Sequence, residues 1–211
     1  MIRTTALAVL LAASFPAFTA EQAKAKVDLA KAKEIAEGVC VACHAADGNS
    51  PTSANPIIAG QIPEYLYKQL SNFKAVDGKP AVRNNAIMGG MVAALSDEDM
   101  KSLSVYFSRQ KMKPSVAKEE KLLAEGKTLW RKGDFDKGVP ACAGCHGPAG
   151  AGLPVQYPRL AGQYAEYTAS QLRTFRSHER ANDSEKVMRQ IAGKLSDQQI
   201  NAVAEYAAGL R

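Results

Sequence analysis

The segment CVACH, from Cys40 to His44, has a counterpart in CAGCH, from Cys142 to His146. Both are C-x-x-C-H motifs, the attachment signature of c-type haem. On a helix, thiols three positions apart lie about one turn from each other, so both can bond the two vinyl groups on one edge of a porphyrin. The histidine after the second cysteine then lies under the iron and can supply an axial nitrogen. The sequence therefore predicts two covalently bound haem c groups.

Two other uses of paired cysteines fit the sequence less well. A structural zinc site takes four nitrogen or sulfur ligands, whereas each cysteine pair here adjoins one histidine, and the only other histidine is His178. A C-x-x-C redox disulfide needs a thioredoxin-like βαβ context, which the sequence does not predict. We therefore assign all four cysteines to haem attachment: Cys40, Cys43, Cys142 and Cys145.

The first 20 residues are typical of a secretory signal peptide. Arg3 gives a positive n-region, Ala6 to Ala13 is unbroken and apolar, and small residues follow as far as Ala20. The apolar run is shorter than the roughly 20 residues that span a membrane. We therefore expect cleavage after Ala20, or at the A-x-A site at residues 23–25, and a periplasmic location. A retained N-terminal anchor, giving loose membrane association, is the alternative.

Charge is spread evenly along the chain. Of the 211 residues, 27 are Lys or Arg and 21 are Asp or Glu, which gives a formal net charge of +6. Residues 21–113 carry 12 basic and 10 acidic groups, and residues 114–211 carry 14 and 11. Because there is no concentrated basic arm, we expect no nucleic-acid partner. Weak, salt-sensitive docking on an acidic face of a partner protein fits this pattern better.

The two halves of the chain are an internal repeat. An offset of 102 residues superposes the two haem motifs and continues downstream of them, and an offset of 100 then aligns Leu95–Asp97 with Leu195–Asp197. The identical pairs at the first offset include Pro56 with Pro158, Ala59–Gln61 with Ala161–Gln163, Tyr65 with Tyr167, Gln69 with Gln171 and Phe73 with Phe175. We therefore predict two homologous domains, residues 21–113 and 114–211.

The repeat also selects a second axial ligand for each iron. A His-ligated haem that transfers electrons usually takes Met or a second His on its other face. The second half has a single methionine, Met188, seven residues before Leu195, and Met88 stands seven residues before Leu95. We therefore predict that His44 and Met88 ligate one iron, and that His146 and Met188 ligate the other.

Met91 and His178 are the competing ligands. Met91 aligns with Ile191, which cannot ligate, so Met88 is preferred. His178 aligns with Val76, so the repeat gives it no ligand role, and we expect a surface or propionate-contacting residue.

Three further residues are expected near the haem groups. We expect the second ring nitrogen of each axial histidine to bond a backbone carbonyl, that of Pro56 or Pro158, each twelve residues downstream of its histidine. Arg159 aligns with Ile57, and is interpreted either as a propionate ligand of the second haem or as a solvated side chain.

The secondary structure predicted from the sequence is helical. Helices are expected over residues 27–36, from residue 62, over 121–132, and from the N-caps Ser96 and Ser196, with Gln199 completing a capping box at the last of these. A loop is expected at residues 133–138. Long alternating strands are not predicted, so each half should be a small all-α unit around a porphyrin.

Together, these features resemble the cytochrome c₄ family of tandem class I cytochrome c domains. The most specific are the paired motifs, the P-x-x-A-G-Q strings from Pro56 and Pro158, and the two Met-x₆-Leu-Ser-Asp segments. The resemblance runs from about Val27 to Arg211. It implies an all-α fold of two haem domains related by a pseudo-two-fold axis. One pattern of many class I domains, a Gly and an aromatic residue one turn apart where the first and last helices cross, is matched by Gly126 with Trp130, but the first half has alanines at 32 and 36.

The resemblance also implies a function. The chain would carry single electrons in the periplasm, from the quinol-oxidising bc₁ complex to a terminal oxidase, often of the cbb₃ type, and would catalyse no bond chemistry. The alternative is the dihaem cytochrome subunit of an oxidoreductase, such as flavocytochrome c sulfide dehydrogenase. A dihaem peroxidase would need an open or switchable haem.

Overall fold

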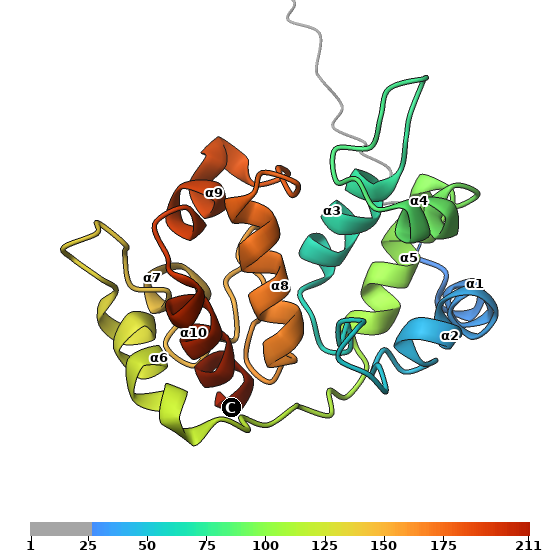
Figure 1. Cartoon of the computed structure of the whole chain (residues 1–211). Coiled ribbons are helices and arrows are strands. Elements are labelled where there is room, and N and C mark those ends of the chain that lie inside the picture. The colour runs from blue at the N-terminus through green and yellow to red at the C-terminus, as the bar shows by residue number, and fades with distance from the viewer. Residues whose placement is uncertain (1–26) are drawn as a thin grey trace, which may run out of the picture.

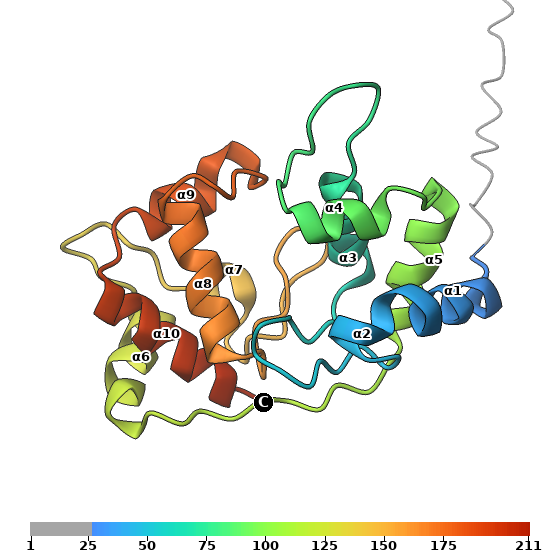
Figure 2. The same ribbon diagram turned by 45° about the vertical axis from the view of Figure 1, so that its right-hand side comes forward.

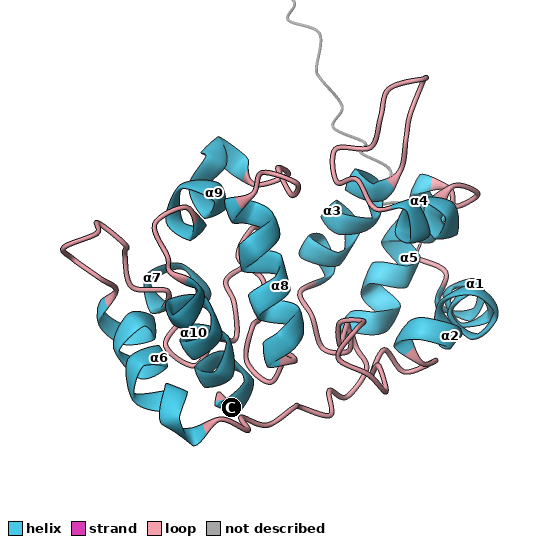
Figure 3. Cartoon of the chain, viewed as in Figure 1, coloured by secondary structure: helices cyan, strands magenta, loops and turns pink. Residues whose placement is uncertain are grey.

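The computed structural model describes residues 27–211, and the expected signal peptide, residues 1–20, lies outside that range. Within the described range the chain forms helices joined by loops, with isolated β-bridges in place of strands (Figure 3). The elements are α1 (Leu29–Ile35), η1 (Ala36–Cys40), α2 (Val41–His44), α3 (Pro63–Phe73), α4 (Ala86–Val92), α5 (Asp97–Ser108), α6 (Glu120–Lys132), α7 (Ala143–His146), α8 (Ala165–Arg176), η2 (Ser184–Lys186), α9 (Val187–Ala192) and α10 (Asp197–Gly209). The all-α prediction is confirmed.

The helices form two groups. In Figure 1, α1 to α5 lie to one side and α6 to α10 to the other, and α3 and α8 face each other in the middle. A view turned by 45° keeps this arrangement (Figure 2). The extended segment between α5 and α6 runs along one edge and joins the groups. The fold is therefore a pair of helical units with one helix of each at their interface.

The first half differs from expectation at its first helix. The sequence predicts one α-helix over residues 27–36, but α1 ends at Ile35 and continues as a π-helical turn, η1, which ends at Cys40. A π-turn adds a residue per turn to a helix and is often found at functional sites. Here η1 runs directly into α2 and carries the first cysteine of the motif, so the chain enters the motif without a loop.

The second half enters its motif differently. Helix α6 begins one residue before the predicted start and ends at Lys132, and the next residue, Gly133, has φ +74°. A Cβ on Gly133 would lie 2.1 Å from the carbonyl oxygen of Val139, so only glycine fits this close turn. The predicted 133–138 loop follows, with Phe135 at 96% exposure. The loop lengthens the route from α6 to α7.

Both halves close by crossing their first and last long helices. At the α6–α10 crossing, a Cβ on Gly126 would lie 2.1 Å from the carbonyl oxygen of Ala202, so the two backbones touch. In the first half, Ala32 and Ala36 are fully buried in the core cluster that also contains Leu103 and Phe107 of α5. The last helices, α5 and α10, both begin at capping boxes, Ser96 with Asp99 and Ser196 with Gln199. In the first domain, small alanine side chains thus take the place that Gly126 has at the α6–α10 crossing.

Candidate haem sites

The first site is built on η1 and α2. Cys40 and Cys43 are half-buried free thiols, and burial raises the pKa of Cys40 to about 11. His44 ends α2 and is 8% exposed. Its Nδ1 lies 3.0 Å from the carbonyl oxygen of Pro56, as the sequence predicted. A carbonyl only accepts, so Nδ1 carries the hydrogen and Nε2 keeps its lone pair for a metal.

The second site repeats this geometry on α7. His146 is 7% exposed, and its Nδ1 lies 3.0 Å from the carbonyl oxygen of Pro158, which confirms the second proline prediction. Burial lowers the pKa of His146, and the hydrogen bond to the Pro158 carbonyl opposes this only partly. The pKa of His44 is lowered in the same way, against the hydrogen bond to Pro56. Burial raises the pKa of Cys142 to about 11. Both imidazoles are therefore kept neutral, the form that ligates iron.

The two candidate methionines of the first half differ in burial. Met88 lies on α4, which begins where the Asn85 side chain accepts a hydrogen bond from the Met88 amide at 2.9 Å. It is half-buried and, like Cys40, packs against the core cluster of the first half. Met91 is 46% exposed. The position of Met88 supports it over Met91, and Met188 is likewise half-buried on α9.

One aromatic residue, Trp130, lies beside the second histidine, and the two basic residues considered near the haem groups, Arg159 and His178, have other surroundings. The indole Nε1 of Trp130 donates to the carbonyl oxygen of Pro148 at 3.2 Å, and the Trp130 ring lies 6.4 Å from that of His146. Arg159 Nε donates to the carbonyl oxygen of Ala161 at 3.3 Å, so its side chain is held close to its own backbone. His178 is exposed with φ +67°, a position that supports a surface role.

The chemistry of this donor set fits haem c. Each half supplies two thiols outside any disulfide, a neutral buried imidazole with a free Nε2, and a half-buried thioether. These are the groups that attach a c-type haem and close both axial positions of its iron.

Sequence reasoning missed two buried arginines at the interface of the halves. Arg83 and Arg180 are 9% and 8% exposed and bond across it. The fixed offset of 102 pairs Arg180 with Gly78, which hid the correspondence. A search for an arginine shortly after Phe73 and Phe175, with the spacing left free, would have found both.

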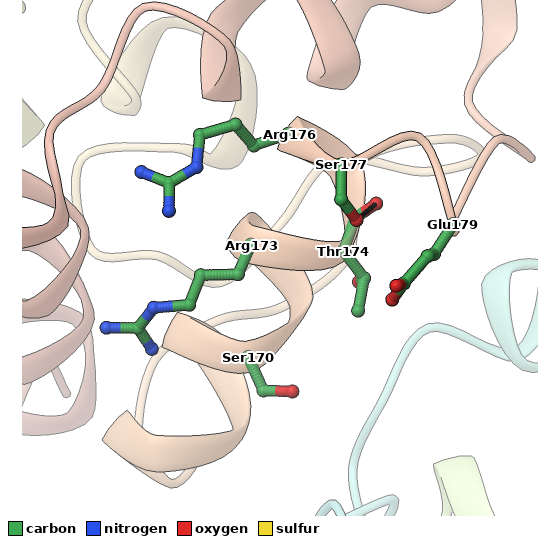
Figure 4. Close-up of a pocket in the computed structure, with 6 residues that line it drawn as sticks. All are labelled: Ser170, Arg173, Thr174, Arg176, Ser177 and Glu179. Carbon is green, nitrogen blue, oxygen red and sulfur yellow. Dashed lines mark hydrogen bonds between the residues drawn. The ribbon is translucent and has the colours of Figure 1, made fainter.

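A surface depression on α8 is unrelated to these sites. Figure 4 shows Arg173 and Arg176 pointing to one side of its lining and Glu179 to the other. The two arginines bond Asp197 at 3.3 and 2.7 Å, at the start of α10. None of the predicted haem-binding residues lines the depression, so we assign it a packing role.

Comparison with known proteins identifies the fold. The cytochrome c family matches residues 29–110 and, a second time, residues 123–210. Cytochrome c4 from Pseudomonas aeruginosa is 44% identical over 183 residues, which is 86% of this chain and 88% of the relative. The thiosulfate dehydrogenase electron acceptor from Thiomonas intermedia is 38% identical and covers 80% of this chain and 77% of its own length.

A solved structure agrees with these relatives. Reduced recombinant cytochrome c4 from Pseudomonas stutzeri superposes with a TM-score of 0.80 at 40% identity, over 88% of this chain and all of that one. Every helix within residues 27–211 is too short or too polar to span a bilayer. The cytochrome c family matches both halves, the relatives and the superposition cover most of the chain, and the two C-x-x-C-H sites have the same geometry. The chain therefore belongs to the cytochrome c₄ family and carries electrons on two covalently bound haem c groups.

Proposed function

We propose that the protein is a periplasmic respiratory carrier that takes electrons from the bc₁ complex and passes them to a terminal oxidase, such as one of the cbb₃ type. The observation that supports this most is that each half holds a buried histidine and, on a separate helix, a half-buried methionine. Bound haem supplies the one-electron Fe(III)/Fe(II) couple. His44 and Met88 would hold one haem iron, and His146 and Met188 the other, so neither iron would keep an open position for a substrate.

The residues of the chain tune this couple and limit rearrangement. The carbonyls of Pro56 and Pro158 fix the tautomer and the orientation of each histidine. A methionine thioether favours the ferrous state relative to a second imidazole and so raises the potential. On α9, Arg189 donates to Asp183 at 2.7 Å through Nε, a nearly buried ion pair beside Met188. These fixed partners keep the ligands in place while an electron arrives.

We also propose the domain limits 21–113 and 114–211, after removal of a signal peptide at residues 1–20. The extended segment between α5 and α6, and the gap at residues 111–122 between the two family matches, support a boundary there. The N-terminal sequence of the protein purified from periplasm tests the cleavage site. Residue 21 at the N-terminus is expected, and an intact Met1 would contradict it.

An optical redox titration tests the ligands. Two His/Met haems should each contribute the long-wavelength Fe(III)–thioether band, and the band should disappear in two one-electron steps. Only half of the expected absorbance would disprove one methionine assignment. Rapid oxidation by membranes that contain the terminal oxidase, and reduction by bc₁ complex with quinol, test the route.

A second function is that of an electron-accepting partner of a sulfur-compound dehydrogenase. The name of the Thiomonas intermedia relative, an electron acceptor of thiosulfate dehydrogenase, supports it, and a dihaem subunit of a flavocytochrome c sulfide dehydrogenase is the corresponding subunit role. Copurification with a flavoprotein or a dehydrogenase would favour this role over the bc₁ route. Fast peroxide turnover by the pure protein would contradict the carrier role altogether.

A further inference from the structure

Arg83 and Arg180 form a shared cage with two glutamines where α3 faces α8. Arg83 donates to Oε1 of Gln69, in its own half, at 2.8 Å and to Oε1 of Gln171, in the other half, at 2.7 Å. Arg180 donates to the same two oxygens, at 2.8 Å to Gln171 and 3.2 Å to Gln69. Because each oxygen accepts from both guanidinium groups, the two cations lie next to each other. We call these two residues the arginine pair.

The arginine pair obeys the pseudo-two-fold symmetry. The Arg83 guanidinium lies 4.5 Å from the ring centre of Phe73, and that of Arg180 lies 4.4 Å from Phe175. Each guanidinium also reaches a tyrosine of the opposite half, Arg180 to Tyr65 at 3.0 Å and Arg83 to Tyr167 at 3.3 Å. The arginine of each domain therefore forms hydrogen bonds with side chains of the other domain.

The arginine pair forms no salt bridge within residues 27–211. Among residues 27–211, no carboxylate lies within 4.0 Å of either guanidinium, and their bonded partners are neutral amide and phenol oxygens. The neighbouring Asp183 is engaged by Arg189. Two adjacent buried cations repel each other and lose hydration, which is unfavourable unless anions are bound. The site therefore calls for negatively charged ligands.

Tyr65 responds to the same positive field. Burial raises the pKa of this phenol, but Arg180 and Arg83 outweigh burial, and its pKa is lowered overall. An anion placed between the two arginines would meet the same stabilisation.

The arginine pair also lies in the chain segments that precede the two methionine-bearing helices, α4 and α9. Phe73, on which Arg83 lies, belongs to the core cluster that Cys40 and Met88 join. Arg83 precedes α4, which carries Met88, and Arg180 lies in the loop between α8 and α9, which carries Met188. A haem c group has two propionates, and these are carboxylates, which form charge-assisted hydrogen bonds with guanidinium groups.

We propose that the arginine pair binds one propionate from each haem, and that each haem potential therefore depends on an arginine of the opposite domain. This inference rests on the proposed placement of the two haem groups. A guanidinium offsets the negative charge of a propionate, and that charge otherwise stabilises ferric iron. Removing either arginine should then make both haem groups harder to reduce.

The test is a spectroelectrochemical titration of the haem-loaded variants R83Q and R180Q. Each single substitution is expected to lower both midpoint potentials, with the larger shift about tenfold in the reduction equilibrium, or about 59 mV for a one-electron couple. R83K and R180K keep the charge and should restore most of the shift. R109Q removes the same charge from an exposed residue after α5 and should leave both potentials unchanged.

Three outcomes would overturn the inference. Unchanged potentials in R83Q and R180Q, with the thioether band intact and only thermal stability lost, would make the arginine pair structural and leave the proposed function standing. A shift confined to one haem would rule out the shared cage. If exchanging chloride for phosphate at constant ionic strength moved the potentials, and R83Q abolished that effect, a diffusible anion would be the occupant. Absence of the thioether band in the unaltered protein would instead refute the proposed ligands.

Discussion

The side-chain amide of Gln61 exchanges two hydrogen bonds with the backbone of Arg159, its Nε2 donating at 2.9 Å and its Oε1 accepting at 2.8 Å. Gln163 makes the mirrored pair with Ile57, at 2.8 and 3.0 Å. At the offset of 102, Gln61 corresponds to Gln163 and Ile57 to Arg159. In each half, one glutamine side-chain amide thus pairs with the backbone N–H and C=O of a residue in the other half. The loops they hold begin at Pro56 and Pro158, the carbonyl partners of the axial histidines.

Replacing Gln61 or Gln163 with alanine should loosen this interface. Each change removes two hydrogen bonds across the interface and one to the amide of the next residue, and it leaves a backbone N–H and C=O of the other half without these partners. We expect a cost of about 2 kcal/mol in the free energy of unfolding. The double variant should separate denaturant unfolding into two transitions, since the domains would lose their coupling. Urea titrations followed by circular dichroism and by haem absorbance measure both effects. Gln198→Ala, which removes an exposed bond to Glu125, is the control and should change little.

The close crossing of α6 and α10 makes a second prediction. Gly126→Ala places a Cβ 2.1 Å from the carbonyl oxygen of Ala202 and 2.7 Å from Cβ of Tyr206, so the helices must move apart. Overpacking of this kind costs about 1–3 kcal/mol, which exceeds the roughly 1 kcal/mol that alanine gains in helix propensity. Thermal unfolding should show a net loss of stability.

Gly38→Ala is the matched control for that change. Gly38 also lies in a helical segment, but nothing lies within 4 Å of its Cβ position. The same propensity gain should therefore be neutral or stabilising there. Equal effects at the two positions would show that the α6–α10 contact is not under steric control.

Much of the fold could be predicted because its signals are local. A cysteine spacing, a serine N-cap and a fixed repeat each depend on a few neighbouring residues, and they predicted the haem motifs, both last helices and the proline partners of the histidines. The π-turn before Cys40 was missed because helix propensity does not distinguish it from an α-helix. The turn joins α1 to α2, and Ala32 of α1 and Ala36 of the turn stay fully buried.

The interface was the harder part to predict. The identity of Gln61 with Gln163 was visible, but its role required knowing which loops meet across the domains. Arg83 follows Phe73 by ten residues and Arg180 follows Phe175 by five, so a fixed offset could not match them. Only the contacts on the two phenylalanine rings show that they are equivalent. Local sequence patterns do not show which residues pair across the two domains when the loops between them differ in length.

The choice of Met88 over Met91 gives a direct test of the first haem site. Met88→Ala should abolish about half of the Fe(III)–thioether band and lower one midpoint potential, because the iron loses its soft ligand. Met91→Ala should keep the full band, since Met91 is 46% exposed. Met188→Ala should remove the other half. Loss of the band in Met91→Ala, with Met88→Ala unaffected, would reverse the assignment.

The two capping boxes differ in a way that predicts how each domain responds to acid. At the third helical position α5 has Asp99, which titrates, and α10 has Gln199, which does not. The bond to Lys31, followed by that to the Ser96 amide, lowers the pKa of Asp99. A lowered folded-state pKa contributes stability that is present above the unfolded value of about 3.9 and is lost as pH falls through the folded value. Asp99→Gln should therefore flatten the acid limb of a stability-against-pH curve below about pH 4, at a cost near neutral pH of about 1 kcal/mol. Gln199→Asp should introduce an acid limb into the second domain, and an unchanged curve in both variants would remove Asp99 as its source.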